Sequence, residues 1–313
     1  MRYRNLGRSG LSVSVVGLGC NNFGGALDAP AAERVVHAAL DAGITLFDTA
    51  AAYGAGESER QLGAALKGRR EGAVIATKFG GMGDPPLGEA AGSKGGRAYI
   101  RRALDSALTR LGTDYIDLFQ LHRPDPATPI AETLGALDDE VRAGRVRYVG
   151  CSGLAAWQLA DAAHVARGLG VQGFVSTLGE WSLLERGIER EVVPAALAHG
   201  LGILPAFPLA SGLLTGKVAP DGTAPAGSRL AGWAAKFITP ERLAHVERLR
   251  GWADAHGLTL GEVAIGWLAA QSPVGSVIAG ASNPAQVEAN ARAAAWVPDA
   301  AALAEVAGLG AGL

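Results

Sequence analysis

Residues 41–50, DAGITLFDTA, contain the unit that decides the fold of this chain. Asp41-Ala-Gly43 ends an amphipathic helical segment, because glycine readily adopts the left-handed conformation found at helix C-termini. The apolar run Ile44–Phe47 has the length and composition of a strand, and the polar residue Asp48 follows it directly. If this unit recurs, the chain alternates helices with parallel strands.

The unit recurs along the whole sequence. Eight short runs rich in apolar residues are strand candidates: Val13–Leu18, Ile44–Phe47, Ala73–Thr77, Tyr115–Gln120, Val146–Cys151, Gly173–Thr177, Gly202–Phe207 and Ser276–Ala279. Helix-like segments lie between them, near residues 31–41, 58–67, 99–111, 129–142, 155–167, 190–199, 240–256, 260–271 and 284–293. Strands separated in this way pair in parallel through right-handed crossovers, and eight of them predict an α/β fold closed into a (β/α)8 TIM barrel.

Two further features complete the predicted architecture. The segment Tyr3–Ser14, with Gly7 and Gly10 between short extended pieces, indicates a hairpin before the first barrel strand, at the closed end of the barrel. No shift in composition marks a second domain, so residues 1–313 are expected to form one barrel domain. The Gly/Pro-rich stretches 80–96 and 218–232 are predicted to be long loops over the open end.

Composition narrows the class of partner. The 313 residues are 49% hydrophobic and 19% charged with a net charge of −2, which disfavours binding to nucleic acid or acidic membranes through bulk positive charge. No apolar run reaches the ~18 residues of a membrane span, and the N-terminus does not resemble a signal peptide, so a cytoplasmic protein is expected. Cys20 and Cys151 are too far apart for a thiolate metal motif, and no pair of histidines has metal-binding spacing, so no metal is predicted.

Three familiar motifs are incomplete. Gly17-Leu-Gly19 lacks the third glycine of a dinucleotide fingerprint, and Ser211–Val218 lacks the first glycine and final Ser/Thr of a phosphate loop. Gly150-Cys-Ser152-Gly153 is one residue short of a nucleophile elbow. Any dinucleotide is therefore expected to be held by barrel loops.

Four residues at predicted strand ends form a candidate catalytic group. Asp48 and Tyr53 follow the second predicted strand, Lys78 the third and His122 the fourth, so all four belong to the open end of a barrel. Carbonyl reduction needs a proton for the nascent alkoxide, and a free tyrosine with a pKa of ~10 is a weak acid for this purpose. We expect Lys78 to lower the pKa of Tyr53 and Asp48 to hold Lys78 charged, while His122 positions the carbonyl oxygen or relays the proton.

Each of these residues also has an ordinary structural interpretation. An aspartate at a strand end often caps a loop or a helix, and His122 before Arg123-Pro124 could anchor a turn. Independent structural residues would not be expected to gather at the same end of three consecutive strands. Their shared placement therefore favours catalysis.

The chain resembles the aldo-keto reductases from the N-terminal hairpin to Asn290. The matching segments are Phe47-Asp-Thr-Ala50 with Tyr53-Gly54 and Ser58-Glu59, Ala76-Thr-Lys-Phe79, Leu111–Leu118 with Leu121-His122, Pro208-Leu209 with Gly212–Lys217, and Gly280-Ala-Ser282 with Gln286 and Asn290. The resemblance implies a barrel that binds NADP(H) in an extended form, and it places the family's Asp–Tyr–Lys–His tetrad on Asp48, Tyr53, Lys78 and His122.

The resemblance also implies the surroundings of the cofactor and substrate. Ser152 would bond the carboxamide, and Lys217 would lie along the pyrophosphate, where its charge suits phosphate. The full cofactor set is Gly19, Ser152, Phe207, Pro208, Leu209, Ser211, Lys217, Arg229, Gly280, Ser282, Gln286 and Asn290. A small carbonyl compound would bind beside Phe23, Phe79, His122 and Trp181.

The departures from the family pattern cluster around the nicotinamide. Gly153 stands where the family has Asn, Leu178-Gly179 replaces a Gln-Asn pair, and Ala206 replaces an aromatic residue. These changes predict a looser hold on the ring, unless other contacts compensate. Phe207 could stack on the ring instead, but strand alternation predicts that its side chain points to the other side of the strand. Trp181, in place of the family's Tyr, would narrow the same region.

Three functions are consistent with this pattern. The first is an NADPH-dependent reductase of aldehydes or ketones, with hydride from the nicotinamide and a proton from Tyr53. The second is a non-redox elimination, isomerisation or cyclisation on the same barrel, because the nicotinamide contacts are altered. The third is a regulatory barrel similar to the family's channel-associated subunits; the intact His122 favours chemistry instead.

Overall fold

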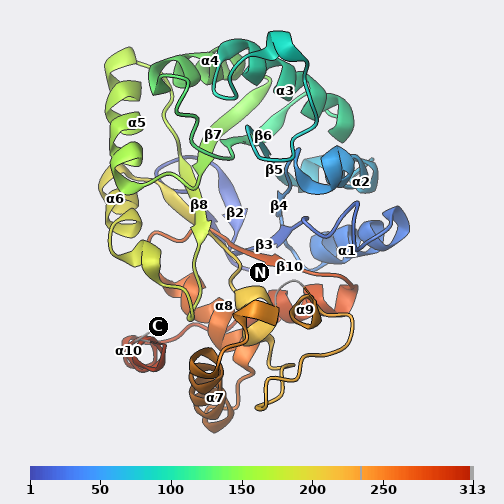
Figure 1. Ribbon diagram of the computed structural model, residues 1–313, viewed down its shortest axis with the longest axis vertical. Helices are drawn as coiled ribbons and strands as arrows, with labels where there is room; N and C mark the ends of the chain where they lie inside the picture. Colours follow the sequence, from blue (N-terminus) through green and yellow to red (C-terminus); the bar gives the residue numbers. More distant parts are fainter. Residues whose placement is uncertain (233–234, 311–313) are drawn as a thin grey trace.

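The computed structural model describes residues 1–232 and 235–310, except for the side chain of Arg229. Eight parallel strands form one sheet in the order β10-β3-β4-β5-β6-β7-β8-β9 (Figure 1). They are β3 (Val16–Gly19), β4 (Leu46–Asp48), β5 (Val74–Phe79), β6 (Ile116–Leu121), β7 (Val146–Ser152), β8 (Ser176–Glu180), β9 (Gly202–Ala206) and β10 (Val277–Gly280). A parallel bridge between Ile203 and Val274 joins β9 to the segment before β10, so the sheet is nearly closed and the predicted (β/α)8 barrel is confirmed.

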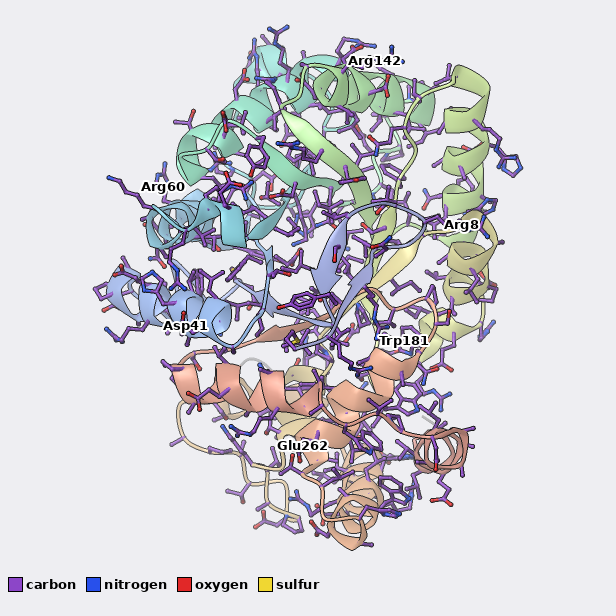
Figure 2. The ribbon with its side chains drawn as sticks, turned by 180° about the vertical axis from the view of Figure 1, so that it is seen from behind. Arg8, Asp41, Arg60, Arg142, Trp181 and Glu262 are labelled. Atoms are coloured by element: carbon purple, nitrogen blue, oxygen red, sulfur yellow. The ribbon has the colours of Figure 1, made fainter. Side chains whose placement is uncertain are left out.

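The N-terminal hairpin plugs one end of the barrel. Strands β1 (Tyr3–Asn5) and β2 (Ser12–Ser14) pair antiparallel. The loop between them is held close to the start of β9, because a Cβ atom at Gly7 would lie 2.5 Å from the backbone nitrogen of Gly202. The hairpin therefore covers the N-terminal ends of the barrel strands, and it lies in front in Figure 2, which shows the molecule from behind. The predicted strand Val13–Leu18 is divided between β2 and β3.

Helices surround the barrel. They are α1 (Ala29–Asp41), α2 (Glu57–Ala65), α3 (Arg97–Leu111), α4 (Ile130–Arg142), α5 (Ala156–Leu169), α6 (Val192–His199), α7 (Pro240–Ala255), α8 (Leu260–Ala270), α9 (Pro284–Ala293) and α10 (Ala300–Leu309). Local sequence explains their starts: Asp28 caps α1 with a proline in the first turn, and Thr259 and Glu262 form a capping box on α8. Helix α10 was not predicted, although Asp299 caps it. No helix within the described ranges is long and apolar enough to cross a membrane.

The barrel interior changes from apolar to polar toward its open end. Leu46, Ala76 and Leu118 are buried in one cluster with Leu6 and Val13 of the hairpin. Residues two apart on a strand point to the same side, so the next layer of the interior carries Asp48, Lys78 and Gln120. In the strand register Lys78 pairs with Gln120, whereas Asp48 pairs with Ala76 and reaches Lys78 through a hydrogen bond of 2.7 Å. The sheet thus gathers these polar side chains near the C-terminal ends of its strands.

Candidate active site

Lys78 is the centre of a buried polar cluster at the open end of the barrel. Its ammonium group donates to Asp48 Oδ2 at 2.7 Å, to the Thr49 carbonyl oxygen at 2.8 Å and to the Tyr53 hydroxyl oxygen at 3.3 Å. The rings of Tyr53 and His122 meet edge to face, with centroids 6.2 Å apart. The structure therefore brings the four predicted catalytic residues together.

Gln120 belongs to this cluster and was not predicted. Its amide nitrogen donates to Asp48 Oδ1 at 3.3 Å, so both carboxylate oxygens of Asp48 accept hydrogen bonds from barrel side chains. The sequence did contain a signal for it. Gln120 lies two residues before His122, so its side chain points to the same side of β6 and lies deeper in the barrel than His122.

The loop after β4 carries Tyr53 toward the cluster. Gly54 and Ala55 both have left-handed backbone conformations, with φ of 56° and 53°, and this reverses the chain before α2. The start of α2 is anchored in the core, because the Ser58 hydroxyl donates to the Cys20 carbonyl oxygen at 2.8 Å. Glu59, buried beside it, accepts from Arg110 at 2.6 Å. These contacts fix the loop from which Tyr53 projects.

The pKa of Lys78 agrees with the expectation from sequence, but the pKa of Tyr53 does not. Burial disfavours the charge on Lys78, but Asp48 and Tyr53 outweigh burial, so the pKa of Lys78 is raised above its usual value. For Tyr53, burial and Asp48 together outweigh Lys78, and the pKa of the phenol is raised. The expected lowering of the Tyr53 pKa is therefore wrong for this structure. The physical reason is first the burial of the phenol, which disfavours its charged form, and then the charge of Asp48, which opposes the effect of Lys78.

His122 is held as a neutral ring. Burial, together with the charges of Lys78, Arg123 and Lys94, lowers the pKa of its imidazole to about 3. Near neutral pH the ring therefore carries a single proton and acts as a hydrogen-bonding group, with one nitrogen as donor and the other as acceptor.

A cavity of about 580 Å³ opens beside this cluster. Asp48 and Tyr53 line one part of it, and Lys217 with Ser282 and Gln286 lines another. Nine of the residues predicted to bind the cofactor line this cavity: Gly19, Phe207, Pro208, Leu209, Ser211, Lys217, Gly280, Ser282 and Gln286. Ser152 and Asn290 are buried outside the lining, and the Asn290 amide donates to the Gly280 carbonyl oxygen at 3.2 Å. The side chain of Arg229 lies outside the described part of the structure.

Charge along the cavity is unevenly distributed. Among the described lining residues, Asp48 is the only acid, and Lys78 neutralises it. Lys217 has no ion pair within the described part of the chain. The end of the cavity near Lys217 is thus suited to an anionic ligand.

Phe207 lines the cavity, contrary to the expectation from strand alternation. Strand β9 ends at Ala206, and Phe207 has a left-handed backbone with φ of 52°. This turn breaks the alternation, so the aromatic ring, 39% exposed, belongs to the lining beside Ala206. An aromatic face is therefore present at the site where position 206 lacks one.

The other altered positions leave the neighbouring wall apolar or open. Leu178 lines the cavity with an aliphatic side chain. Gly153 donates its backbone N–H to the Leu178 carbonyl oxygen at 3.1 Å, and nothing lies within 4 Å of where its Cβ would be. Its φ of 68° is one that asparagine tolerates better than most residues, so the conformation is compatible with the family's Asn.

None of the four residues predicted to contact substrate is part of the cavity lining. His122 meets the lining residue Tyr53 edge to face, and the other three lie elsewhere. Phe23 and Phe79 are fully buried, and Phe79 stacks on Phe119 with ring centroids 4.6 Å apart. Trp181, labelled in Figure 2, packs edge to face on Trp267, and its indole N–H donates to Glu189 at 2.9 Å. The structure thus corrects these three assignments: the rings fill the core instead of lining the cavity, because tertiary packing covers them on all sides.

Comparisons with known proteins agree with this architecture. The model of the "Aldo/keto reductase family" matches residues 15–310. A Bacillus subtilis (strain 168) protein named "Uncharacterized oxidoreductase YrpG" is 40% identical, and the match covers 90% of this chain and 87% of that protein. A rice (Oryza sativa subsp. japonica) "Probable voltage-gated potassium channel subunit beta" is 36% identical, with 95% and 92% covered. "Probable aldo-keto reductase 1" of Glycine max is 35% identical, with 85% and 76% covered.

Proposed function

This chain belongs to the aldo/keto reductase family and is an oxidoreductase in its general class, and on that premise we propose that it is an NADPH-dependent reductase of aldehyde or ketone carbonyls. The observation that carries the proposal is that Tyr53, bonded to the buried Lys78–Asp48 pair, faces the same cavity as Lys217. A proton donor and a site for an anionic ligand thus share one space.

The residues of the cavity fit an elongated, anionic dinucleotide. Lys217 is available to the pyrophosphate, and Pro208, Leu209 and Ser211 lie on the loop that leads to it. Ser282 and Gln286 would hold the adenosine end; in the structure their side chains are preordered, since the Ser282 hydroxyl and backbone N–H both donate to Gln286 Oε1. NADPH, when bound, supplies the hydride.

Tyr53 is the group that protonates the substrate oxygen. A phenol with a raised pKa still protonates an alkoxide, which is a far stronger base. The phenolate that remains is stabilised by Lys78, which keeps its charge because Asp48 raises its pKa. Because Gln120 and Lys78 occupy both oxygens of Asp48, the carboxylate is held as the partner of Lys78.

The apolar wall beside this cluster favours a second candidate function. Leu178 and Ala206 present aliphatic atoms where the family pattern has amide and aromatic groups, so the nicotinamide relies on Phe207 for ring contact. If that contact is insufficient, the same tetrad would catalyse a non-redox elimination, isomerisation or cyclisation, in which Tyr53 and Lys78 move protons without hydride transfer.

One assay separates the candidates. The purified protein is titrated with NADPH while nicotinamide fluorescence is followed, and the decay of NADPH absorbance is then measured with a panel of aldehydes and ketones. Saturable binding with turnover supports the reductase. Binding without turnover on any carbonyl contradicts it and favours a regulatory barrel that holds the nucleotide without reducing a carbonyl. No binding favours the non-redox reaction.

A further inference from the structure

Gly81, in the loop after β5, lies between two buried polar atoms that lack hydrogen-bond partners. A Cβ atom added to Gly81 would lie 2.5 Å from His122 Nδ1 and 2.9 Å from Asp84 Oδ1. Both of these atoms are buried, and neither has a partner within the described structure. Two unpaired polar atoms of complementary kind thus flank one point in space, and pairing them would remove the cost of burying each alone.

The carboxylate of Asp84 is fixed in place by its other oxygen. Asp84 Oδ2 accepts from the backbone N–H of Gly81 at 2.9 Å and from the Tyr99 hydroxyl at 3.2 Å. The carbonyl oxygen of Gly81 accepts in turn from the Lys94 ammonium. The loop is therefore anchored on both sides of Gly81, and Oδ1 is the oxygen of Asp84 that remains for His122.

We propose that Asp84 is a positioning residue for His122, whose Nδ1–H donates to Asp84 Oδ1 once the His122 ring turns toward it. The bond keeps the single proton of the ring on Nδ1 and leaves Nε2 as an acceptor. The catalytic consequence rests on the proposed reductase function, but the hydrogen bond itself does not.

The charged groups around His122 leave Asp84 as the acceptor for this proton. Lys78 on β5, Arg123 next to the ring and Lys94 in the anchoring loop are cations, and with burial they keep the ring neutral. Tyr53 meets the ring edge to face, and its hydroxyl oxygen accepts from Lys78. Each ring nitrogen of a neutral histidine has one role, so the choice of partner at Nδ1 determines the role of Nε2.

Tyr53 and His122 then have different roles toward the substrate. With its proton on Nδ1, His122 cannot donate to a carbonyl oxygen, so Tyr53 is the donor to that oxygen. Once the proton has moved from the Tyr53 hydroxyl to the alkoxide, the new alcohol O–H donates to Nε2 of His122. His122 therefore contributes to binding of the alcohol. For oxidation the O–H turns back to the Tyr53 phenolate, which takes its proton.

Nitrogen NMR of the resting protein tests the hydrogen bond without any catalysis. The ¹⁵N shifts of the His122 ring show which nitrogen carries the proton, and the signals are assigned by their loss in His122→Gln. We expect the proton on Nδ1 in the wild type. In Asp84→Asn the amide can donate to Nδ1, so the proton is expected to move to Nε2, as in other aspartate–histidine pairs where the amide enforces the wrong tautomer.

Asp125→Asn is the matched control. Asp125 orders the same region by accepting from the backbone N–H of Gly95 at 2.6 Å and from Thr128 at 2.8 Å, but it is not among the charged groups that shift the pKa of His122. This variant should leave the His122 shifts unchanged. A proton on Nε2 in the wild type, or the same tautomer in Asp84→Asn, would overturn the proposal, whether or not the protein reduces carbonyls.

Steady-state kinetics test the catalytic consequence. Asp84→Asn should raise KM for the alcohol in the oxidation direction about fivefold, the loss of one ordinary hydrogen bond, with kcat and the affinity for NADP⁺ nearly unchanged. An unchanged KM for the alcohol in a variant whose tautomer has moved would remove the assigned role of Nε2 while leaving the reductase function intact.

Discussion

The ammonium of Lys78 lies 2.7 Å from the carboxylate of Asp48, and their side chains are 0% and 4% exposed. Buried ion pairs of this kind often stabilise a fold no more than apolar residues of similar volume would. Here each residue of the pair follows, two positions along its strand, an apolar residue of the barrel interior, Leu46 or Ala76. Apolar side chains at positions 48 and 78 would simply extend that apolar interior. The presence of the ion pair at the open end, in contact with Tyr53, is explained by chemistry better than by stability.

Asp48→Asn should destabilise the protein, because it leaves the Lys78 charge buried without its counter-charge. We expect the free energy of unfolding in urea to fall by about 3–5 kcal/mol. Asp41→Asn is the control, since it breaks the exposed pair with Arg69, whose side chains are 41% and 67% exposed, and should cost less than about 1 kcal/mol. Equal decreases in the free energy of unfolding for the two variants would show that the buried ion pair stabilises the fold no more than the exposed one.

Tyr53→Phe should remove the proton donor while keeping the ring and its packing. We expect kcat for carbonyl reduction to fall by a factor of about 10² or more, with NADPH affinity from fluorescence titration nearly unchanged. Tyr3→Phe, which loses only a hydrogen bond to the Gly43 carbonyl oxygen on the far side of the barrel, should keep full activity. A Tyr53→Phe variant that retains its rate would exclude Tyr53 as the acid.

Lys217→Gln should weaken NADPH binding, because a charged hydrogen bond to phosphate contributes about 1.5–3 kcal/mol. The dissociation constant is expected to rise about tenfold or more, and its dependence on salt concentration should decrease. Lys67→Gln removes an exposed charge far from the cavity lining and provides the comparison. An unaltered affinity for NADPH in Lys217→Gln would argue against the cofactor path along this loop.

Gly81→Ala should impair catalysis through a steric effect. The new methyl group would lie 2.5 Å from His122 Nδ1. The backbone cannot easily shift away, because the Gly81 N–H donates to Asp84 and the Gly81 carbonyl oxygen accepts from Lys94. We expect kcat to fall at least about tenfold with NADPH affinity retained, as for other displaced active-site groups. Gly25→Ala, in another loop at the open end and with nothing within 4 Å of its Cβ, should have little effect.

His122 should make stability depend on pH on the acid side. The unfolded ring takes up a proton below its ordinary pKa of ~6.5, whereas the folded ring stays neutral down to about 3. Stability from this group is therefore complete above pH ~6.5 and is lost as the pH falls toward 3, by at most about 1.4 kcal/mol per pH unit.

Urea unfolding between pH 7 and 4 checks this slope. His122→Gln, which cannot titrate, should flatten it relative to the wild type, and the exposed His164→Gln serves as the surface control. An identical slope in wild type and His122→Gln would contradict a depressed pKa for this ring.

Much of the architecture could be predicted from local sequence alone. Alternating helical and strand-like runs identified all eight barrel strands to within a few residues, because burial patterns repeat along each element. The same logic located Asp48, Lys78 and His122, since a polar residue after an apolar run must lie at a strand end. Parallel pairing then forces those ends to the same side of the sheet.

Other features depend on groups that meet only when the barrel is nearly closed. Phe207 enters the cavity because the backbone turns left-handed after β9, whereas Trp181 and Phe79 are covered by aromatic neighbours from other elements. The approach of Asp84 to His122 joins two loops that are 38 positions apart in sequence. Periodicity along the chain determined which residues face which side, but burial depth, pKa and through-space contacts are properties of packed surroundings, and these were decided by the tertiary structure alone.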